Sequence, residues 1–189
     1  MNVVVPSKRP PPFSLQGSAK CGPINDLPVL GQKYNEFVIV GAGKTAIDAV
    51  LFLLKNDLNP EKISWIMPRD SWILDRAQIQ PTFESIGMAL TSQIIPGSQS
   101  EDIDDFFDKI SKAGGLLRID DNVKPTMYRC STVTRAELEQ LKRVENIIRK
   151  GRVKSINDTE IVLENGSIAT NLETLHVAVS YTHLTLPTN

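Results

Sequence analysis

The sequence lacks residues and segments that several classes of protein require. Its 189 residues include only two cysteines, Cys21 and Cys130, which lie far apart and form no Cys-x-x-Cys pair. This argues against a zinc site or a redox dithiol and suits a reducing compartment. No apolar run approaches the ~20 residues of a membrane span, and the N-terminal residues do not have the pattern of a signal peptide. We therefore expect a cytoplasmic protein with no metal ion and no membrane partner.

An excess of charge of one sign is also lacking. The formal net charge is −1 and the hydrophobic content is 41%, which is enough for one globular core. Near-neutral charge gives no reason to expect a nucleic-acid partner. No residue is a convincing acid, base or nucleophile, so the catalytic residues of any reaction are left unknown.

The most informative segment is a glycine-bearing turn. The apolar residues 37–40 run straight into Gly41, and the largely apolar segment 46–54 follows at helical length. A strand that ends in Gly-x-Gly-x-x-Ala and opens a helix is typical of a dinucleotide-binding turn. The first glycine permits the tight turn, the second lets a pyrophosphate approach the backbone, and the small alanine permits close packing. The predicted cofactor-binding residues of the turn are Gly41, Ala42, Gly43, Lys44, Thr45 and Ala46.

The sequence of this turn leaves one other interpretation open and excludes a second. An ordinary glycine turn in a strand–helix unit remains an alternative to dinucleotide binding. A nucleotide triphosphatase P-loop does not, because it requires a glycine five residues before Gly43, where this chain has Val38.

A second strand is expected over residues 62–67, which completes a right-handed strand–helix–strand unit with parallel strands. The residue after this strand discriminates between nicotinamide cofactors, because an acid binds the ribose 2′-hydroxyl and an arginine suits a 2′-phosphate. The chain has Pro68-Arg69-Asp70 at the end of this strand, and Arg69 favours NADP over NAD. The alternative is a surface ion pair of Arg69 with Asp70 or Asp75.

The remaining pattern predicts a mixed α/β protein. Residues 71–76 and 125–130 are expected to be loops, and residues 83–93, 101–113 and 134–149 to be helices. An antiparallel meander follows over residues 152–156, 159–163 and the hairpin at Asn165-Gly166, and residues 174–177 return to the parallel sheet. The predicted fold class is α/β, with a Rossmann-type parallel sheet, helices on both faces and a small antiparallel meander.

The ends of the chain differ from its middle. Residues 1–35 are rich in proline and have little core of their own, so we expect a leader that precedes a domain at residues 36–177. Residues 179–188 resemble the translation of a transposase sequencing adapter. We therefore expect residues 178–189 to be a tail that is not native.

The segments 37–48 and 64–72, with the later meander and return strand, resemble the NAD(P)-binding portion of flavin-containing monooxygenase-like proteins and the wider pyridine nucleotide-dependent FAD oxidoreductases. The resemblance extends over roughly residues 3–177, and its motif residues here are Gly41, Gly43, Ala46 and Arg69. It implies that hydride passes from NADPH, with NAD as the alternative cofactor, to FAD. The substrate would be an unidentified small molecule.

The family has a flavin domain before this one, yet no second Gly-x-Gly-x-x-Gly occurs in the chain. The resemblance therefore implies that residues 1–35 are the remnant of an FAD domain, which would be the missing partner of the nucleotide-binding domain. Whether this chain alone is an enzyme is a separate question, and we expect it to be inactive. The alternatives are a non-catalytic Rossmann-type dinucleotide-binding or sensor protein, and a fragment that binds nothing and aggregates through exposed sheet edges.

Overall fold

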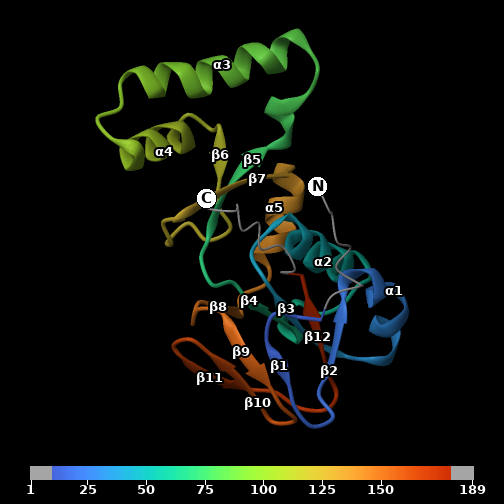
Figure 1. Cartoon of the computed structure of the whole chain (residues 1–189). Helices are drawn as coiled ribbons and strands as arrows, with labels where there is room; N and C mark the ends of the chain where they lie inside the picture. The colour runs from blue at the N-terminus through green and yellow to red at the C-terminus, as the bar shows by residue number, and fades with distance from the viewer. Residues whose placement is uncertain (1–9, 180–189) are drawn as a thin grey trace, which may run out of the picture. The chain divides into compact units, whose positions relative to one another are not determined.

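The computed structural model describes residues 10–179, apart from the side chain of residue 129. The described chain forms two compact units (Figure 1). Residues 10–68 and 144–179 make up the first unit, and Arg69–Arg143 make up the second. The chain therefore leaves the first unit after Pro68 and returns to it at Val144.

The first unit is built on a five-stranded sheet in which every pair of neighbours is parallel. Its strands, in spatial order, are β2 (Lys20–Pro23), β12 (Thr174–Ala178), β3 (Glu36–Val40), β4 (Ile63–Ile66) and β8 (Ile147–Ile148). The helix α2 (Lys44–Lys55) connects β3 to its neighbour β4. Four short helical segments complete the connections: η2 (Ile24–Asp26), α1 (Leu27–Leu30), η3 (Gly31–Lys33) and η4 (Pro60–Lys62).

The two faces of this sheet are covered differently. Val38, Val40 and Ile66 pack in one buried cluster with residues of a second, four-stranded sheet. That sheet contains β1 (Ser14–Leu15), β9 (Val153–Ile156), β10 (Glu160–Leu163) and β11 (Gly166–Ala169). Side chains alternate along a strand, so Phe37 and Ile39 point to the opposite face, where α2 lies (Figure 1). The prediction of helices on both faces is wrong here, because the antiparallel meander takes the place of one helical layer.

The second unit contains a three-stranded sheet and three α-helices. Its elements are β5 (Ser71–Asp75), η5 (Arg76–Ile79), α3 (Phe83–Ser98), α4 (Ile103–Lys112), β6 (Leu116–Leu117), β7 (Met127–Val133) and α5 (Arg135–Lys142). β5 lies in the middle, antiparallel to β6 and parallel to β7. The core of the sheet and α4 contains Trp72, which stacks on Phe107 with ring centroids 6.1 Å apart.

Several sequence predictions are confirmed. The parallel strands β3 and β4 with the connecting α2, the meander β9–β10–β11, and the return strand β12 beside β3 all form where the pattern predicted them. The coarse fold class, α/β with a parallel sheet, is therefore correct.

Three local predictions are wrong. The helix expected over residues 134–149 ends at Lys142, and Ile147–Ile148 instead form strand β8 beside β4. The capping box of Thr134 and Glu137 does begin the helix. At Ile147–Ile148, however, parallel pairing with β4 outweighs the local helix propensity. The expected loops at residues 71–76 and 125–130 contain all of β5 and the first half of β7, which pair with each other.

The proline-rich leader contributes to both sheets of the first unit. β1 pairs with β9, and β2 forms the edge of the parallel sheet beside β12. At the other end, β12 continues through Ala178, and the Val179 N–H donates to the Val40 carbonyl at 3.2 Å. The predicted tail therefore begins inside β12 at Ala178, and its residues 180–189 lie outside the described part of the chain.

A histidine is fully buried at the centre of β12. Nδ1 of His176 lies 2.8 Å from the Lys20 carbonyl, which can only accept, so Nδ1 carries the proton. Burial lowers the pKa of His176, which favours the neutral ring. In the neutral ring Nε2, 2.9 Å from the Thr170 hydroxyl, accepts a hydrogen bond.

We expect the free energy of unfolding to decrease as the pH falls from about 7.5 to about 5.5, because the unfolded chain, with a histidine pKa of about 6.5, binds the proton more readily than the folded chain does. This stabilisation is complete above the pKa that His176 has in the unfolded chain, and it is lost as the pH falls towards the lower pKa of the folded chain. Urea unfolding at several pH values measures it. The variant His176→Asn should lose this dependence. Carboxylates with a lowered pKa, such as Glu36, change the free energy of unfolding only at lower pH, below about 4.5. A flat profile for the wild-type chain across this interval would contradict the assignment.

Candidate functional site

The turn between β3 and α2 has the backbone conformation that the sequence predicts. Gly41 has φ 137°, a value that a residue with a side chain rarely adopts. Its N–H donates to the carbonyl of Ile66 at 2.9 Å, so the hydrogen bonding between β3 and β4 extends one residue into the turn. Gly41 is therefore a structural requirement of the turn.

A side chain that the sequence analysis missed also holds this turn. The indole Nε1–H of Trp65, on β4, donates to the Gly41 carbonyl at 2.7 Å, and Trp65 is completely buried. Both backbone polar groups of Gly41 are thus bound to residues of the neighbouring strand. A signal for this was present, since a tryptophan in an apolar buried strand needs an acceptor for its N–H.

The start of α2 has no side-chain cap. Gly43 is the N-cap residue, in an extended conformation, and no side chain caps the helix. Its carbonyl accepts from the N–H groups of Ala46 at 2.9 Å and Ile47 at 3.2 Å, which starts the helical ladder. Ala46 is fully buried, as expected for a residue that lets helix and strand pack closely. The N–H groups of the first turn and the helix dipole favour an anion at this end.

The polar side chains of the turn play a smaller part. Lys44 forms an ion pair with Asp48 one helical turn later, and both side chains are substantially exposed. Thr45 is exposed and Ala42 is half-buried. The six predicted residues of the turn are therefore adjacent in space as in sequence, and the backbone N–H groups are their main chemical feature.

The turn lies at the carboxyl edge of the parallel sheet, beside a reversal of strand order. From β3 the chain passes through α2 to β4 on one side, whereas β12 and then β2 lie on the other side. Ligands of open α/β sheets bind outside the carboxyl ends of the strands at such a point. The turn thus occupies the position in the sheet where a ligand is expected.

Arg69 and the turn belong to different units of the chain. Arg69 is exposed at a bend after β4 and is the first residue of the second unit, whereas the turn belongs to the first. Of the proposed alternative partners, Asp75 is bound by Arg135 at 2.9 Å and accepts from the Ala77 N–H at 3.1 Å. The role of Arg69 at a 2′-phosphate stays a prediction.

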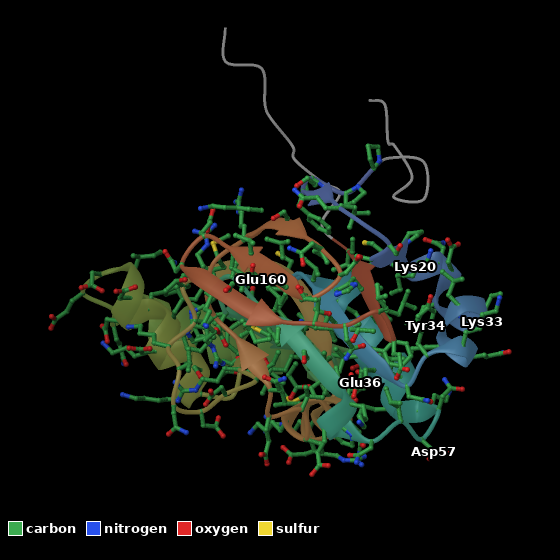
Figure 2. The ribbon with its side chains drawn as sticks, turned by 90° about the horizontal axis from the view of Figure 1, so that it is seen from below. Lys20, Lys33, Tyr34, Glu36, Asp57 and Glu160 are labelled. Carbon is green, nitrogen blue, oxygen red and sulfur yellow. The ribbon has the colours of Figure 1, made fainter. Side chains whose placement is uncertain are left out.

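A cavity lies at the opposite edge of the parallel sheet, beside Glu36 at the start of β3 (Figure 2). Its volume is about 280 Å³. Glu36 on its wall is bound by Lys62 at 2.9 Å and by Asn171 at 3.1 Å, and these hydrogen bonds lower the pKa of Glu36. Because Glu36, Lys62 and Asn171 on its wall are already paired with one another, and because ligands of parallel sheets bind at the other edge, we assign this cavity no ligand.

The cysteines do not form a reactive site. Burial raises the pKa of the Cys21 thiol to about 11, so this thiol is not a nucleophile at neutral pH. Cys130 is exposed in a bulge of β7, where its φ is 52°. Neither residue lies in the turn.

The chain is similar to mycobacterial proteins of greater length. No family model matches it. Three proteins, one from Mycobacterium bovis and two from strains of Mycobacterium tuberculosis, are 47% identical to it over 184 residues, and each is named only as an uncharacterized protein. The match covers 94% of this chain and 33% of each relative, so the chain spans about a third of the length of these curated relatives. Among the described residues, no helix is long and apolar enough to cross a membrane.

We expect Trp65→Phe to lower the free energy of unfolding by about 1–3 kcal/mol, because the buried Gly41 carbonyl loses its N–H donor. Urea denaturation measures the change. Trp72→Phe is the control for the change of ring size, since Trp72 is almost as deeply buried in the second unit. Equal losses in the two variants would show that packing, and not the hydrogen bond to the turn, makes Trp65 stabilising.

Proposed function

We propose that this chain is the NAD(P)H-binding part of an FAD-dependent, monooxygenase-like oxidoreductase. The observation that carries the proposal is the Gly41 turn, with its positive φ, its bonds to β4, and the uncapped start of α2 beyond it. A backbone turn of this kind at the carboxyl edge of a parallel sheet supports a bound pyrophosphate.

The strand order supports a Rossmann-type interpretation of the fold. Read outward from β3, one side has β4 and β8, and the other has β12 and β2. After β3 the chain adds β4 and β8 on one side and then β12 on the other, which supports a doubly wound interpretation, while the earlier strand β2 lies at the edge. The resemblance to pyridine nucleotide-dependent FAD oxidoreductases includes a meander followed by a return strand. The meander on one face of the sheet and the return strand β12 agree with it.

In this proposal each residue of the turn has a limited task. Gly41 turns the chain, Gly43 keeps the backbone free of a side chain where the pyrophosphate approaches, and the first N–H groups of α2 donate to its oxygens. Trp65 orients the turn through the Gly41 carbonyl. The hydride chemistry is supplied by the cofactors, NADPH as donor and FAD as acceptor, and the protein binds and orients them.

We expect Gly43→Ala to weaken NADPH binding by at least about tenfold with little loss of stability, because φ −93° and ψ −179° suit any residue while the new methyl group obstructs the pyrophosphate. Isothermal titration of the 189-residue chain with NADPH measures the affinity. Gly87→Ala on α3 is the matched control, since a Cβ there meets no atom within 4 Å. Unchanged NADPH affinity in Gly43→Ala, or no binding by the folded wild-type chain, would refute the proposed site.

The preference for NADP over NAD rests on Arg69 and is tested in the same titration. Arg69→Ala should weaken NADPH binding and leave NADH binding nearly unchanged, because only NADPH has the 2′-phosphate that a guanidinium would bind. Equal losses for both cofactors would show that Arg69 does not recognise the phosphate.

The flavin part of the proposal concerns the longer protein. We expect a purified full-length mycobacterial relative to show the visible absorbance of a bound flavin, and NADPH to bleach it without oxygen, because hydride transfer reduces the isoalloxazine ring. A folded relative that binds NADPH and is colourless would favour the alternative, a non-catalytic dinucleotide-binding or sensor protein.

A further inference from the structure

The helix α3 carries an exposed apolar stripe, which we define as Phe83, Ile86, Leu90 and Ile94. Intervals of three and four residues place these side chains on one face of the helix. Phe83 is 90% exposed, and the other three are each more than half exposed. Of the twelve large hydrophobic residues that are exposed in the described chain, six lie on α3, the other two being Met88 and Ile95.

The buried side of α3 is, by contrast, small and polar. The Ser85 hydroxyl donates to the Ala77 carbonyl at 3.0 Å, and the Ser92 hydroxyl lies 2.8 Å from Oε1 of Gln78. Pro96 is the third buried residue of this helix. A helix on a protein surface normally buries its apolar face and exposes its polar one. The reversed arrangement of α3, in a helix whose single charged residue is Glu84, is typical of a surface that another protein surface covers.

The charges around the stripe restrict what that surface is. Residues 77–108 contain no lysine, arginine or histidine and six acids. The acids are Glu84, Glu101, Asp102, Asp104, Asp105 and Asp108; Asp105 pairs with Lys109, and Asp104 and Asp108 pair with Lys124. An amphipathic helix that binds anionic lipid needs basic residues beside its apolar face, so a membrane surface does not fit. A second copy of the chain would present the same helix, whose single charged residue is Glu84, so it would offer the stripe an acid and no base of α3, which like-charge repulsion opposes.

We infer that the α3 stripe is an internal docking surface of the longer protein, covered by an apolar surface with lysine or arginine at its rim in the part outside this chain. The mycobacterial relatives supply the length, because about two thirds of each lies outside the matching segment. The matching segment covers 94% of this chain, so the relatives contain the counterpart of the second unit next to that additional sequence. This inference does not depend on dinucleotide binding.

The test compares how fast a cysteine on the stripe reacts with a maleimide in the short chain and in a long one. Phe83→Cys is introduced into a Cys130→Ser background, which removes the exposed native thiol. The long chain is a Mycobacterium tuberculosis relative in which this sequence replaces the matching third. Val29→Cys is the matched control, because Val29 is also a strongly exposed apolar residue but lies on α1 of the first unit.

We expect both cysteines to react quickly in the short chain. In the long chain Phe83→Cys should react at least about tenfold more slowly, at a rate independent of protein concentration, while Val29→Cys is unchanged. Fast reaction at Phe83→Cys in a folded long chain would overturn the inference. Protection that already occurs in the short chain and grows with concentration would also overturn it in favour of a second copy, and protection by anionic vesicles would do so in favour of a membrane. Equal protection of both cysteines would show that the stripe has no special role.

Discussion

The first unit depends on how β3 and β4 hold the backbone between β3 and α2. Gly41 turns with a positive φ, its N–H is bound by the Ile66 carbonyl, and its carbonyl is bound by the Trp65 indole. Both bonds come from the neighbouring parallel strand. The turn is therefore formed only when β3 and β4 pair correctly, and this pairing in turn fixes where α2 begins. The conformation that would receive a pyrophosphate is thus coupled to the assembly of the sheet.

The central strands of the parallel sheet in the first unit are buried because both of its faces are covered. One face packs against α2, whose small residues Ala46 and Ala49 are fully buried and allow a close approach. The other face packs against the meander through a cluster that includes Val38, Ile156 and Ile161. An antiparallel meander can serve here because its strands bury one face and expose the other to solvent. The parallel strand β3, by comparison, is buried on both faces and is apolar along residues 37–40.

The second unit packs its apolar residues differently from the first. Its sheet and α4 share an aromatic cluster in which Phe107 contacts both the buried Trp72 and the exposed Tyr128. Its longest helix, however, buries serines and a proline and exposes its apolar side chains. Local hydrogen bonds through Ser85 and Ser92 hold α3 in place. The hydrophobic stabilisation that this helix could provide is therefore not used within the unit, which is why we assign it to contacts with further sequence of the longer protein.

The sequence by itself determined the elements whose signals are local. The apolar run into Gly41, the helix after Gly43, the hairpin at Asn165-Gly166 and the return strand β12 all depend on neighbouring residues, and each formed as predicted. The six residues of the candidate site could be named for the same reason, because a strand–turn–helix is one continuous segment.

Only the tertiary structure decided the elements that depend on distant partners. Residues 147–148 became a strand because β4 was available to pair with them, and residues 71–75 and 127–133 became strands because they pair with each other. Trp65 joined the site because β4 lies beside β3, and the meander replaced a helical layer because its apolar residues meet Val38 and Val40 across the core. Such contacts join residues far apart in the chain, and a local pattern of hydrophobicity contains no information about which distant segment will supply them.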